Sequence, residues 1–482
     1  MVVFKVLLVI STIAIAGSEP FFGNDVSIPQ SAWLNRDALC VANSLVSARN
    51  ALSSYVRSPP VNSVSLKEGA TCLALYISNV TKLEGDIYLE LGRAVNDRTT
   101  NPAIICSKLN KLVADLKPLL ANSTTYITCI KENFDTSYDN YTHVYYKEWN
   151  EQFVSDALEL ELTLKNICLA IDSLQGKLIP QQFVAELSKN GTLQKLEAVA
   201  SRRCPQATDL SIVASLQYTA INLANNFRST FNSRLQTNRL SARTTVNSYI
   251  ANSNTSLNSI TAAVERFAKH VATMDDAFFF RWPQVPSEPV MSKRILLNQS
   301  IEAMTRRITT QKRFVEDYYL QMSTLFGDIN PPQTYLEHEA ELVTRTLMSW
   351  SKSDTCVLNF RNRLIDLPAQ VHTQLSRCVN NQVTLERNGA NQVVSIVGNV
   401  LQPHVTIVYA NGEICFSYPF SAMSRCLDAF VHKIDFTPQF QVVDFGMFNL
   451  FIKTEPELLL CNERLMNFVQ NLGLGANCFS KV

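Results

Sequence analysis

Glycine is scarce in this chain, with 14 residues among 482. Small β-sandwiches and barrels depend on glycine in their turns, so its scarcity disfavours an all-β fold. The stretch between Pro205 and Pro283 contains neither proline nor glycine, the residues that most strongly interrupt helices. We therefore expect a mainly α-helical protein.

The motifs of several enzyme classes are also missing. The sequence has no Gly-x-Ser-x-Gly elbow, no phosphate-binding glycine loop and no His-Glu-x-x-His pair. The densest group of charges around a histidine is the segment from Glu337 to Glu341, which contains His338. On a helix Glu337 and Glu341 share a face that His338 does not, so a solvated helix face is favoured over a weak metal site. We expect no enzymatic activity, no metal and no cofactor.

Neither sign of charge is in excess. The chain has 43 Lys and Arg against 42 Asp and Glu, and loss of a leader containing Lys5 would make the numbers equal. A neutral chain without a basic run argues against nucleic acid or an anionic membrane as the main partner. Because 46 % of the residues are hydrophobic, the chain can build a core and is not expected to be disordered.

The N-terminus carries a short apolar run. Val6–Ala16 follows the single charge of Lys5, and Ala14 and Ala16 occupy the positions that a signal peptidase reads. The run is too short to span a bilayer, which favours a cleaved signal peptide over a signal anchor. We predict a signal peptide over residues 1–16, secretion to the extracellular space and no membrane span after its removal.

Twelve cysteines fit an oxidising compartment. The closest two, Cys415 and Cys426, are eleven residues apart, which disfavours zinc ligation, and there is no Cys-x-x-Cys redox motif. The pairing cannot be deduced from the sequence, because even six cysteines allow many connectivities. The candidates for structural disulfides are Cys40, Cys72, Cys106, Cys129, Cys168, Cys204, Cys356, Cys378, Cys415, Cys426, Cys461 and Cys478.

The positions of the cysteines suggest a division of the chain. Six lie within 40–204, six lie within 356–478, and none lies between these groups. We predict an N-terminal disulfide-bearing helical segment over 17–204, a cysteine-free long-helix segment over 205–355, and a C-terminal disulfide-bearing segment over 356–482.

Six Asn-x-Ser/Thr triplets are candidate sites of N-glycosylation. Behind a signal peptide such triplets mark residues that we expect to be exposed. They stand at Asn79, Asn122, Asn140, Asn190, Asn254 and Asn298.

A heptad-like seam lies between residues 246 and 278, where apolar residues alternate at spacings of four and three. One member, Ser253, is polar. We favour packing against another helix of the same chain over a parallel coiled coil that would form a homodimer, because the seam is short. The candidates for an interaction seam are Val246, Ile250, Leu257, Ile260, Val264, Phe267 and Val271.

Several further elements are predicted. One long bent helix or two helices should cover 207–280, and others should cover 106–120, 292–326 and 334–350, with Pro118 bending or ending the first of these. Ala157–Leu164 alternates like a strand but consists mostly of helix formers, so we predict a helix. The one strand candidate is 404–418, where Asn411-Gly412 would supply the turn of a small β-hairpin. The predicted fold is mainly α, with long amphipathic helices in antiparallel bundles cross-linked by disulfides.

Two apolar clusters stand out. Phe278, Phe279, Phe280 and Trp282 are expected to plug the end of a helical bundle, with a ligand pocket as the alternative. The second cluster, Asp444–Ile452, is expected to lie in the core.

The cysteine spacing carries a resemblance to a known family. Cys356, Cys378, Cys415 and Cys461 stand on expected amphipathic helices, and this part of the chain resembles TsetseEP-type domains of secreted insect proteins. The chain lacks the Glu-Pro repeat tract of the protein that gives the family its name. The resemblance implies a secreted insect protein without catalytic residues.

Together these features predict a secreted, non-enzymatic glycoprotein that acts as an interaction or structural protein on another extracellular protein. The alternative is a carrier of an apolar small ligand in a helical cavity, which the 25 phenylalanines on a glycine-poor frame suggest.

Overall fold

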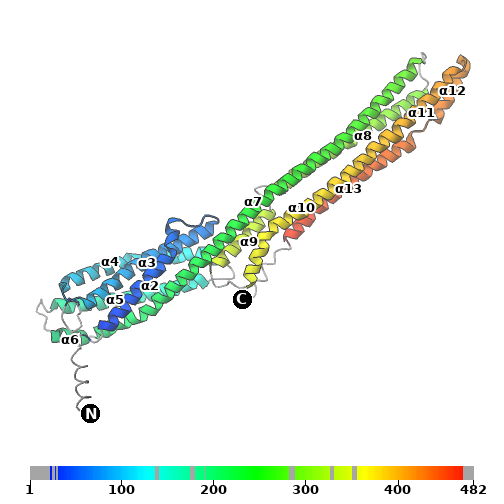
Figure 1. Ribbon diagram of the computed structural model, residues 1–482. Helices are drawn as coiled ribbons and strands as arrows, with labels where there is room; N and C mark the ends of the chain where they lie inside the picture. The colour runs from blue at the N-terminus through cyan, green and yellow to red at the C-terminus, as the bar shows by residue number, and fades with distance from the viewer. Residues whose placement is uncertain are drawn as a thin grey trace, which may run out of the picture. The chain divides into compact units, whose positions relative to one another are not determined.

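The computed structural model describes residues 22–23, 28, 31–135, 141–173, 180–189, 191–281, 288–325, 331–349 and 355–470. It is 94 % helical, and the described residues contain no strand. The predicted signal peptide lies outside the described residues. The helices in Figure 1 are α2 (Ser31–Arg57), α3 (Val64–Asn96), α4 (Pro102–Phe134), α5 (Tyr141–Ser173), α6 (Pro180–Lys189), α7 (Thr192–Arg281), α8 (Glu288–Leu325), α9 (Pro331–Met348), α10 (Thr355–Ile396), the π-helix η1 (Val397–Leu401), α11 (Gln402–Glu413), the 3₁₀ helix η2 (Ile414–Ser417), α12 (Phe420–Lys433) and α13 (Thr437–Gln470).

The contacts between residues group the chain into two compact units. Unit 1 contains residues 1–232, 338–363 and 476–482, and unit 2 contains residues 233–337 and 364–475. Helix α7 contributes residues to both units. The predicted cysteine-free segment 205–355 likewise supplies residues to both, so its helices share cores with the disulfide-bearing parts of the chain.

Several long helices run through a proline instead of ending at it. Helix α7 runs for 90 residues and contains Pro205, so the region predicted as two helices or one long bent helix is a single helix. Helix α4 does not end at Pro118 but continues to Phe134. Because Pro118 is exposed, the carbonyl that loses its N–H partner there can bond with water.

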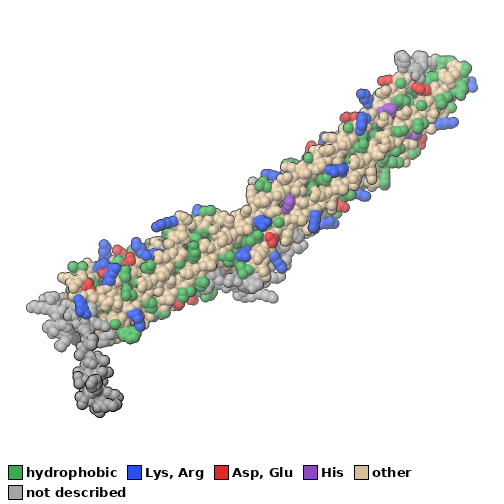
Figure 2. Space-filling model, viewed as in Figure 1, with side chains coloured by type: hydrophobic (Ala, Val, Ile, Leu, Met, Phe, Trp, Pro, Cys, Tyr) green, Lys and Arg blue, Asp and Glu red, His purple; other side chains and the backbone are tan. Residues whose placement is uncertain are grey.

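The segment Ala157–Leu164 is helical, as predicted, and lies within α5. Its alternating leucines therefore do not all lie on one face, as they would in a strand. Leu160 and Leu164 are buried, whereas Leu158 and Leu162 are exposed on the outer face of the helix. Over the viewed face of the molecule, side chains of both charge signs are scattered, in line with the balanced composition (Figure 2).

The predicted β-hairpin over 404–418 is wrong. The segment forms α11 and η2, and Asn411-Gly412 lies inside the last turn of α11. A Cβ atom on Gly412 would lie 2.8 Å from ring atoms of both Phe278 and Phe430. Glycine is therefore needed here because two aromatic rings pack closely against it. From the sequence alone, a glycine needed for close packing looks the same as a glycine needed for a hairpin turn.

Unit 1 is built from helices that follow one another in sequence and contact one another, α2 with α3, α3 with α4, and α4 with α5. Ser63 caps α3 by accepting a hydrogen bond from the N–H of Leu66 at 3.2 Å. Three disulfides join helices within the unit, with Cα–Cα distances of 5.5 to 6.2 Å. They are Cys40–Cys204 between α2 and α7, Cys72–Cys129 between α3 and α4, and Cys106–Cys168 between α4 and α5.

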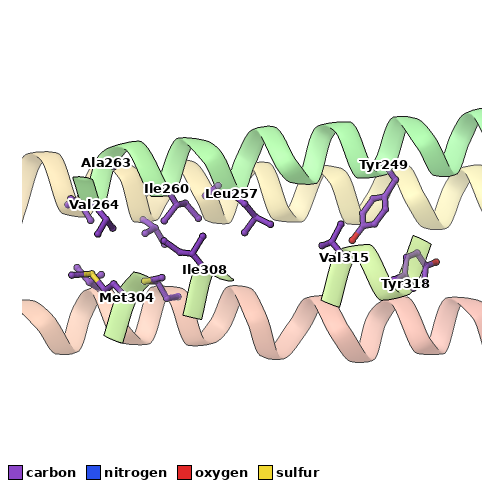
Figure 3. Close-up of a cluster of buried hydrophobic side chains, with 14 of the residues drawn as sticks. Tyr249, Leu257, Ile260, Ala263, Val264, Met304, Ile308, Val315 and Tyr318 are labelled. Carbon is purple, nitrogen blue, oxygen red and sulfur yellow. The ribbon is translucent and has the colours of Figure 1, made fainter. Parts of the chain in front are cut away.

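The core of unit 2 is formed by residues of α7, α8, α10, η1, α11 and α13. Figure 3 shows side chains of α7 such as Leu257 and Ile260 pointing toward Ile308 and Val315 of α8. Cys378–Cys461 joins α10 to α13, and Cys415–Cys426 joins η2 to α12.

Candidate functional site

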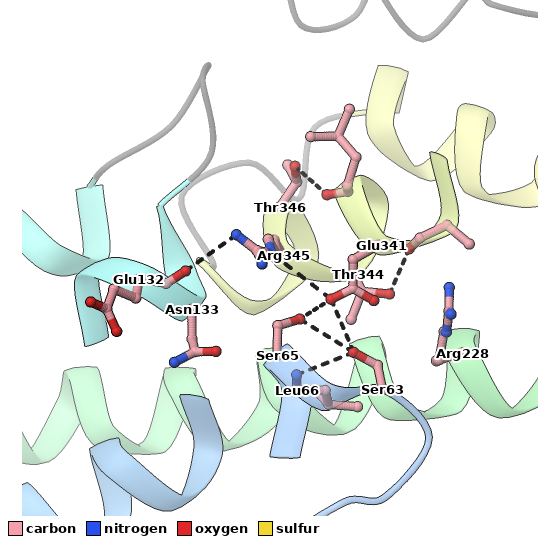
Figure 4. Close-up of polar contacts among 12 residues, drawn as sticks. Ser63, Ser65, Leu66, Glu132, Asn133, Arg228, Glu341, Thr344, Arg345 and Thr346 are labelled. Carbon is pink, nitrogen blue, oxygen red and sulfur yellow. Dashed lines mark hydrogen bonds and ion pairs between the residues drawn. The ribbon is translucent and has the colours of Figure 1, made fainter. Parts of the chain in front are cut away.

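Of the residues that resembled a metal site, Glu341 has structural partners. Glu341 accepts hydrogen bonds from the hydroxyls of Ser63 and Ser65, which ties α9 to the start of α3 (Figure 4). His338 is exposed on the same helix. Within the described residues, no group of three or more His, Cys, Asp or Glu side chains is arranged to hold a metal ion.

A buried ion pair occupies the middle of unit 1. The guanidinium of Arg203 donates two hydrogen bonds to the carboxylate of Glu84, at 2.6 and 3.2 Å, and lies over the rings of Trp149 and Phe153. Burial raises the pKa of Glu84, and the charge of Arg203 offsets part of that rise. Because both groups are closed off from solvent, this pair positions α3 and α7 and offers nothing to a substrate.

A second buried carboxyl group lies in unit 2 and explains the polar member of the seam. Ser253 donates a hydrogen bond to Glu386, and the hydroxyl of Tyr249 donates another at 2.7 Å. Burial raises the pKa of Glu386, and these hydroxyls together with Gln382 offset part of that rise. No cation takes part in this arrangement among the described residues, so the charge of Glu386 is poorly compensated.

The most prominent exposed feature of unit 2 is a pair of apolar rows, which we call rows A and B. Row A consists of Val400, Ile407 and Ile414, which follow one another at intervals of seven along η1, α11 and η2. Row B lies along α13. It consists of Val442, Phe445, Phe448 and Ile452.

Row B lies beside the end of α10 and η1, and of row A only Val400 belongs to these elements. The position of a Cβ on Gly446 is 3.7 Å from Val393 and 3.8 Å from Ile396, which places α13 beside the end of α10. Row B corrects the expectation that Asp444–Ile452 is core. Met447 is buried, but Phe445 is 67 % exposed, because the helix turns only one side of this apolar run toward the core.

Unit 2 also contains a groove between α8 and the beginning of α13. Its volume is about 260 Å³, and its floor includes Leu297, Met304 and Phe440. Lys293 and Asp435 lie among the residues that line it, as does Asp444. A smaller hollow of about 40 Å³, lined in part by Phe278, shares Lys293 with the groove. Of the predicted aromatic cluster, Phe278 thus lines a hollow, and the side chains of Phe279, Phe280 and Trp282 lie outside the described part.

Ten of the twelve predicted cysteines form the five disulfides already described, each within one unit. The side chain of Cys356 and all of Cys478 lie outside what the structure describes. The disulfide-distance pairs are consistent with an extracellular protein.

The predicted glycosylation sites differ in accessibility. Asn122 and Asn298 are exposed, Asn79 and Asn254 are half-buried, and the remaining two, Asn140 and Asn190, lie outside the described residues. The amide of Asn79 donates a hydrogen bond to the hydroxyl of Tyr126 at 2.9 Å. A glycan is therefore better accommodated at Asn122 and Asn298 than at Asn79.

The predicted interaction seam lies in the interior of unit 2. Val246, Leu257, Ile260, Val264, Phe267 and Val271 are buried in its core, and Ile250 packs against them. Helices of the same chain therefore cover the seam, which agrees with the alternative favoured over an intermolecular coiled coil.

One described helical stretch, Val357–Ser417, contains an 18-residue window long and apolar enough to cross a membrane, with a mean hydropathy of 1.4. No Asp, Glu, Lys or Arg stands between Arg387 and Glu413. Core helices of soluble proteins meet the same criteria. Val393, Val397 and Val405 of this stretch are core residues of unit 2, but only 22 % of the apolar window is buried. The absence of a membrane span therefore remains a prediction.

No protein-family model matches the sequence, and comparisons with curated proteins and with solved structures find no match either. The geometry of the site is therefore the only basis for a functional assignment.

Proposed function

We propose that the protein is a secreted, non-enzymatic insect glycoprotein that binds another extracellular protein. In this proposal, disulfide-linked antiparallel helical bundles act as a rigid support, and rows A and B of unit 2 form the contact surface. The single observation that carries the proposal is the exposure of the four large apolar side chains of row B along α13.

Large exposed apolar side chains that follow one another along a helix favour a binding surface over a merely solvated one. Soluble monomers rarely expose extended apolar patches, and aromatic residues are enriched at the centres of protein interfaces. Phe445 and Phe448 of row B fit that role, since removing them from water would contribute most of the binding energy.

The support beneath the rows is suited to recognition without rearrangement. Cys378–Cys461 fixes α10 against α13, the helix that carries row B, and Cys415–Cys426 fixes the end of row A at Ile414. A surface that is rigid before binding loses less conformational entropy when a partner docks.

The test uses the tagged full chain, secreted from insect cells and cross-linked in extracellular fluid from its source. A double variant, Phe445→Gln with Phe448→Gln, is expected to lose the captured partner. The matched comparison is Leu158→Gln with Leu162→Gln, which changes two exposed apolar residues of α5 in unit 1. Loss of the partner in the α5 variant but not in the α13 variant would contradict the assignment to unit 2.

The groove between α8 and α13 favours a second function, that of a carrier of an apolar small ligand. Its floor of Leu297, Met304 and Phe440 offers an apolar environment of about 260 Å³. Native mass spectrometry of the deglycosylated protein tests this function. A mass excess that disappears on denaturation supports a carrier, and a bare mass contradicts it.

A further inference from the structure

The lining of the groove in unit 2 includes one cationic side chain, Lys293, that no described neighbouring side chain binds. Lys293 is half-buried at the lining of the groove, and among the described residues it makes neither a hydrogen bond nor an ion pair. The adjacent Arg294 is already committed, because it binds the carboxylate of Asp275 at 2.8 Å.

The two carboxylates that line the groove are both engaged. Asp444 binds Arg307 at 2.6 Å. Asp435 accepts a hydrogen bond from the N–H of Thr437 at 2.9 Å and thereby caps α13. The hydrogen bonds from Thr437 lower the pKa of the Asp435 carboxyl most, and the nearby positive charge of Lys293 lowers it further. The ammonium group of Lys293 is thus the group in the groove best placed to meet an incoming anion.

The dimensions limit what the groove can hold. Its residues on α8 run from Lys293 to Met304, a length of about 16 Å at the rise of an α-helix. A volume of about 260 Å³ lies below the roughly 300–1,000 Å³ of sites for drug-sized ligands. A single apolar chain fits these limits.

The geometry points to a binding site for a single-chain fatty carboxylate in this groove, with its apolar chain on Leu297, Met304 and Phe440 and its carboxylate at Lys293. The inference rests on the carrier function and names its ligand class, and it is independent of rows A and B. The occupant is a monomeric fatty acid taken from solution and not a bilayer, because the apolar floor lies between two helices and the balanced charge does not attract an anionic surface.

The test is a calorimetric titration of the full chain with dodecanoate, below its critical micelle concentration. Lys293→Glu is expected to weaken binding at least about tenfold, which corresponds to 1.4 kcal/mol. Lys453→Glu makes the same change of charge at an exposed position of α13 outside the groove and is expected to leave binding unchanged.

A second pair of variants tests the floor without changing charge. Ser300 lines the groove and Thr305 does not, and both hydroxyls bond to the carbonyl four residues earlier on α8. Ser300→Phe should fill the groove and abolish dodecanoate binding, whereas Thr305→Phe should preserve it. Circular dichroism of each variant confirms that it is folded.

Three results would overturn the inference: no binding of dodecanoate to the wild-type chain, equal binding of dodecanol and dodecanoate, or binding to anionic vesicles that Lys293→Glu abolishes. Failure of the carrier function is distinguishable from these. A bare native mass, combined with dodecanoate binding that Lys293→Glu weakens, would remove the carrier function and support the site.

Discussion

Arg203 is 0 % exposed, although it is one of the longest charged side chains in the protein. Two hydrogen bonds to Glu84 and one to Gln206, together with the rings of Trp149 and Phe153, replace the water that it loses. Such a pair is costly to break because the remaining charge stays buried without compensation. The pair fixes the position of α3 relative to α7, because each helix contributes one of its two side chains.

We predict that Arg203→Met lowers the free energy of unfolding by about 3–5 kcal/mol, since Glu84 would be left buried without a cation. Arg202→Met is the matched control, because Arg202 is partly exposed and its ion pairs with Asp156 and Glu159 are screened by solvent. Urea unfolding followed by circular dichroism measures both. Equal effects of the two substitutions would contradict the role given to the buried pair.

Glu386 gives unit 2 a dependence on pH. Its folded-state pKa is raised above the ordinary 4.5, so the unfolded chain releases this proton first as the pH increases. The stability contributed by this group is full below the unfolded pKa and is lost as the pH rises through the folded pKa. We therefore expect Glu386→Gln to stabilise unit 2 at neutral pH and to reduce the loss of stability that occurs as the pH rises above 4.5.

The control for this prediction is Glu457→Gln, which neutralises an exposed carboxylate of α13. Thermal melts across the pH range provide the measurement. If both variants follow the same pH profile as the wild-type chain, the hydrogen bonds of Tyr249 and Ser253 already compensate the charge of Glu386.

At the scale of elements, the disulfides differ in the length of chain that they close. Cys378–Cys461 spans 83 residues and Cys415–Cys426 spans 11. Loop-closure entropy then predicts that replacing the first pair by alanine costs about 4.5 kcal/mol and replacing the second about 3 kcal/mol. Denaturant unfolding of each double variant measures this order. A larger loss from the short loop would show that local packing around Cys415 outweighs chain entropy.

The helical class and several elements of the fold could be predicted from the sequence because their signals are local. The long gap in proline and glycine anticipated α7, and helix propensity correctly outweighed the alternation of Ala157–Leu164. The hairpin prediction failed because Asn411-Gly412 is a turn signal only when no tertiary contact needs the glycine. Phe278 of α7 and Phe430 of α12 approach the glycine from other helices, which no local pattern reveals.

The candidate sites were less predictable for the same reason. Row B was mistaken for core, since an apolar run does not show which of its sides a neighbouring helix will cover. Lys293 gave no signal at all, because its availability depends on ion pairs that Arg294 and Arg307 make with Asp275 and Asp444. The polar residue in the seam, Ser253, was the one hint of the buried Glu386.

At the scale of the whole molecule, each unit has a core supplied by its own chain. The seam residues of α7 are already covered by α8, α10 and α13, so folding needs no second chain. We predict that Ile260→Ala lowers the free energy of unfolding by about 2–5 kcal/mol and leaves the oligomeric state unchanged. The exposed neighbour Ser259 serves as control, and Ser259→Ala should change stability by less than about 0.5 kcal/mol.

Sedimentation velocity alongside urea unfolding separates these effects. A dimer that dissociates in Ile260→Ala without loss of monomer stability would contradict the intramolecular seam and restore the coiled-coil alternative.

In the proposed function, export, glycosylation and disulfide formation all precede the binding of a partner. The most direct test is the intact mass of the protein collected from the medium of insect cells, measured before and after removal of glycans and after reduction with alkylation. We predict a product that lacks residues 1–16, loses mass on deglycosylation, and gains alkyl groups at its cysteines only after reduction. Retention inside the cell with an intact leader, or cysteines that alkylate without reduction, would contradict the account.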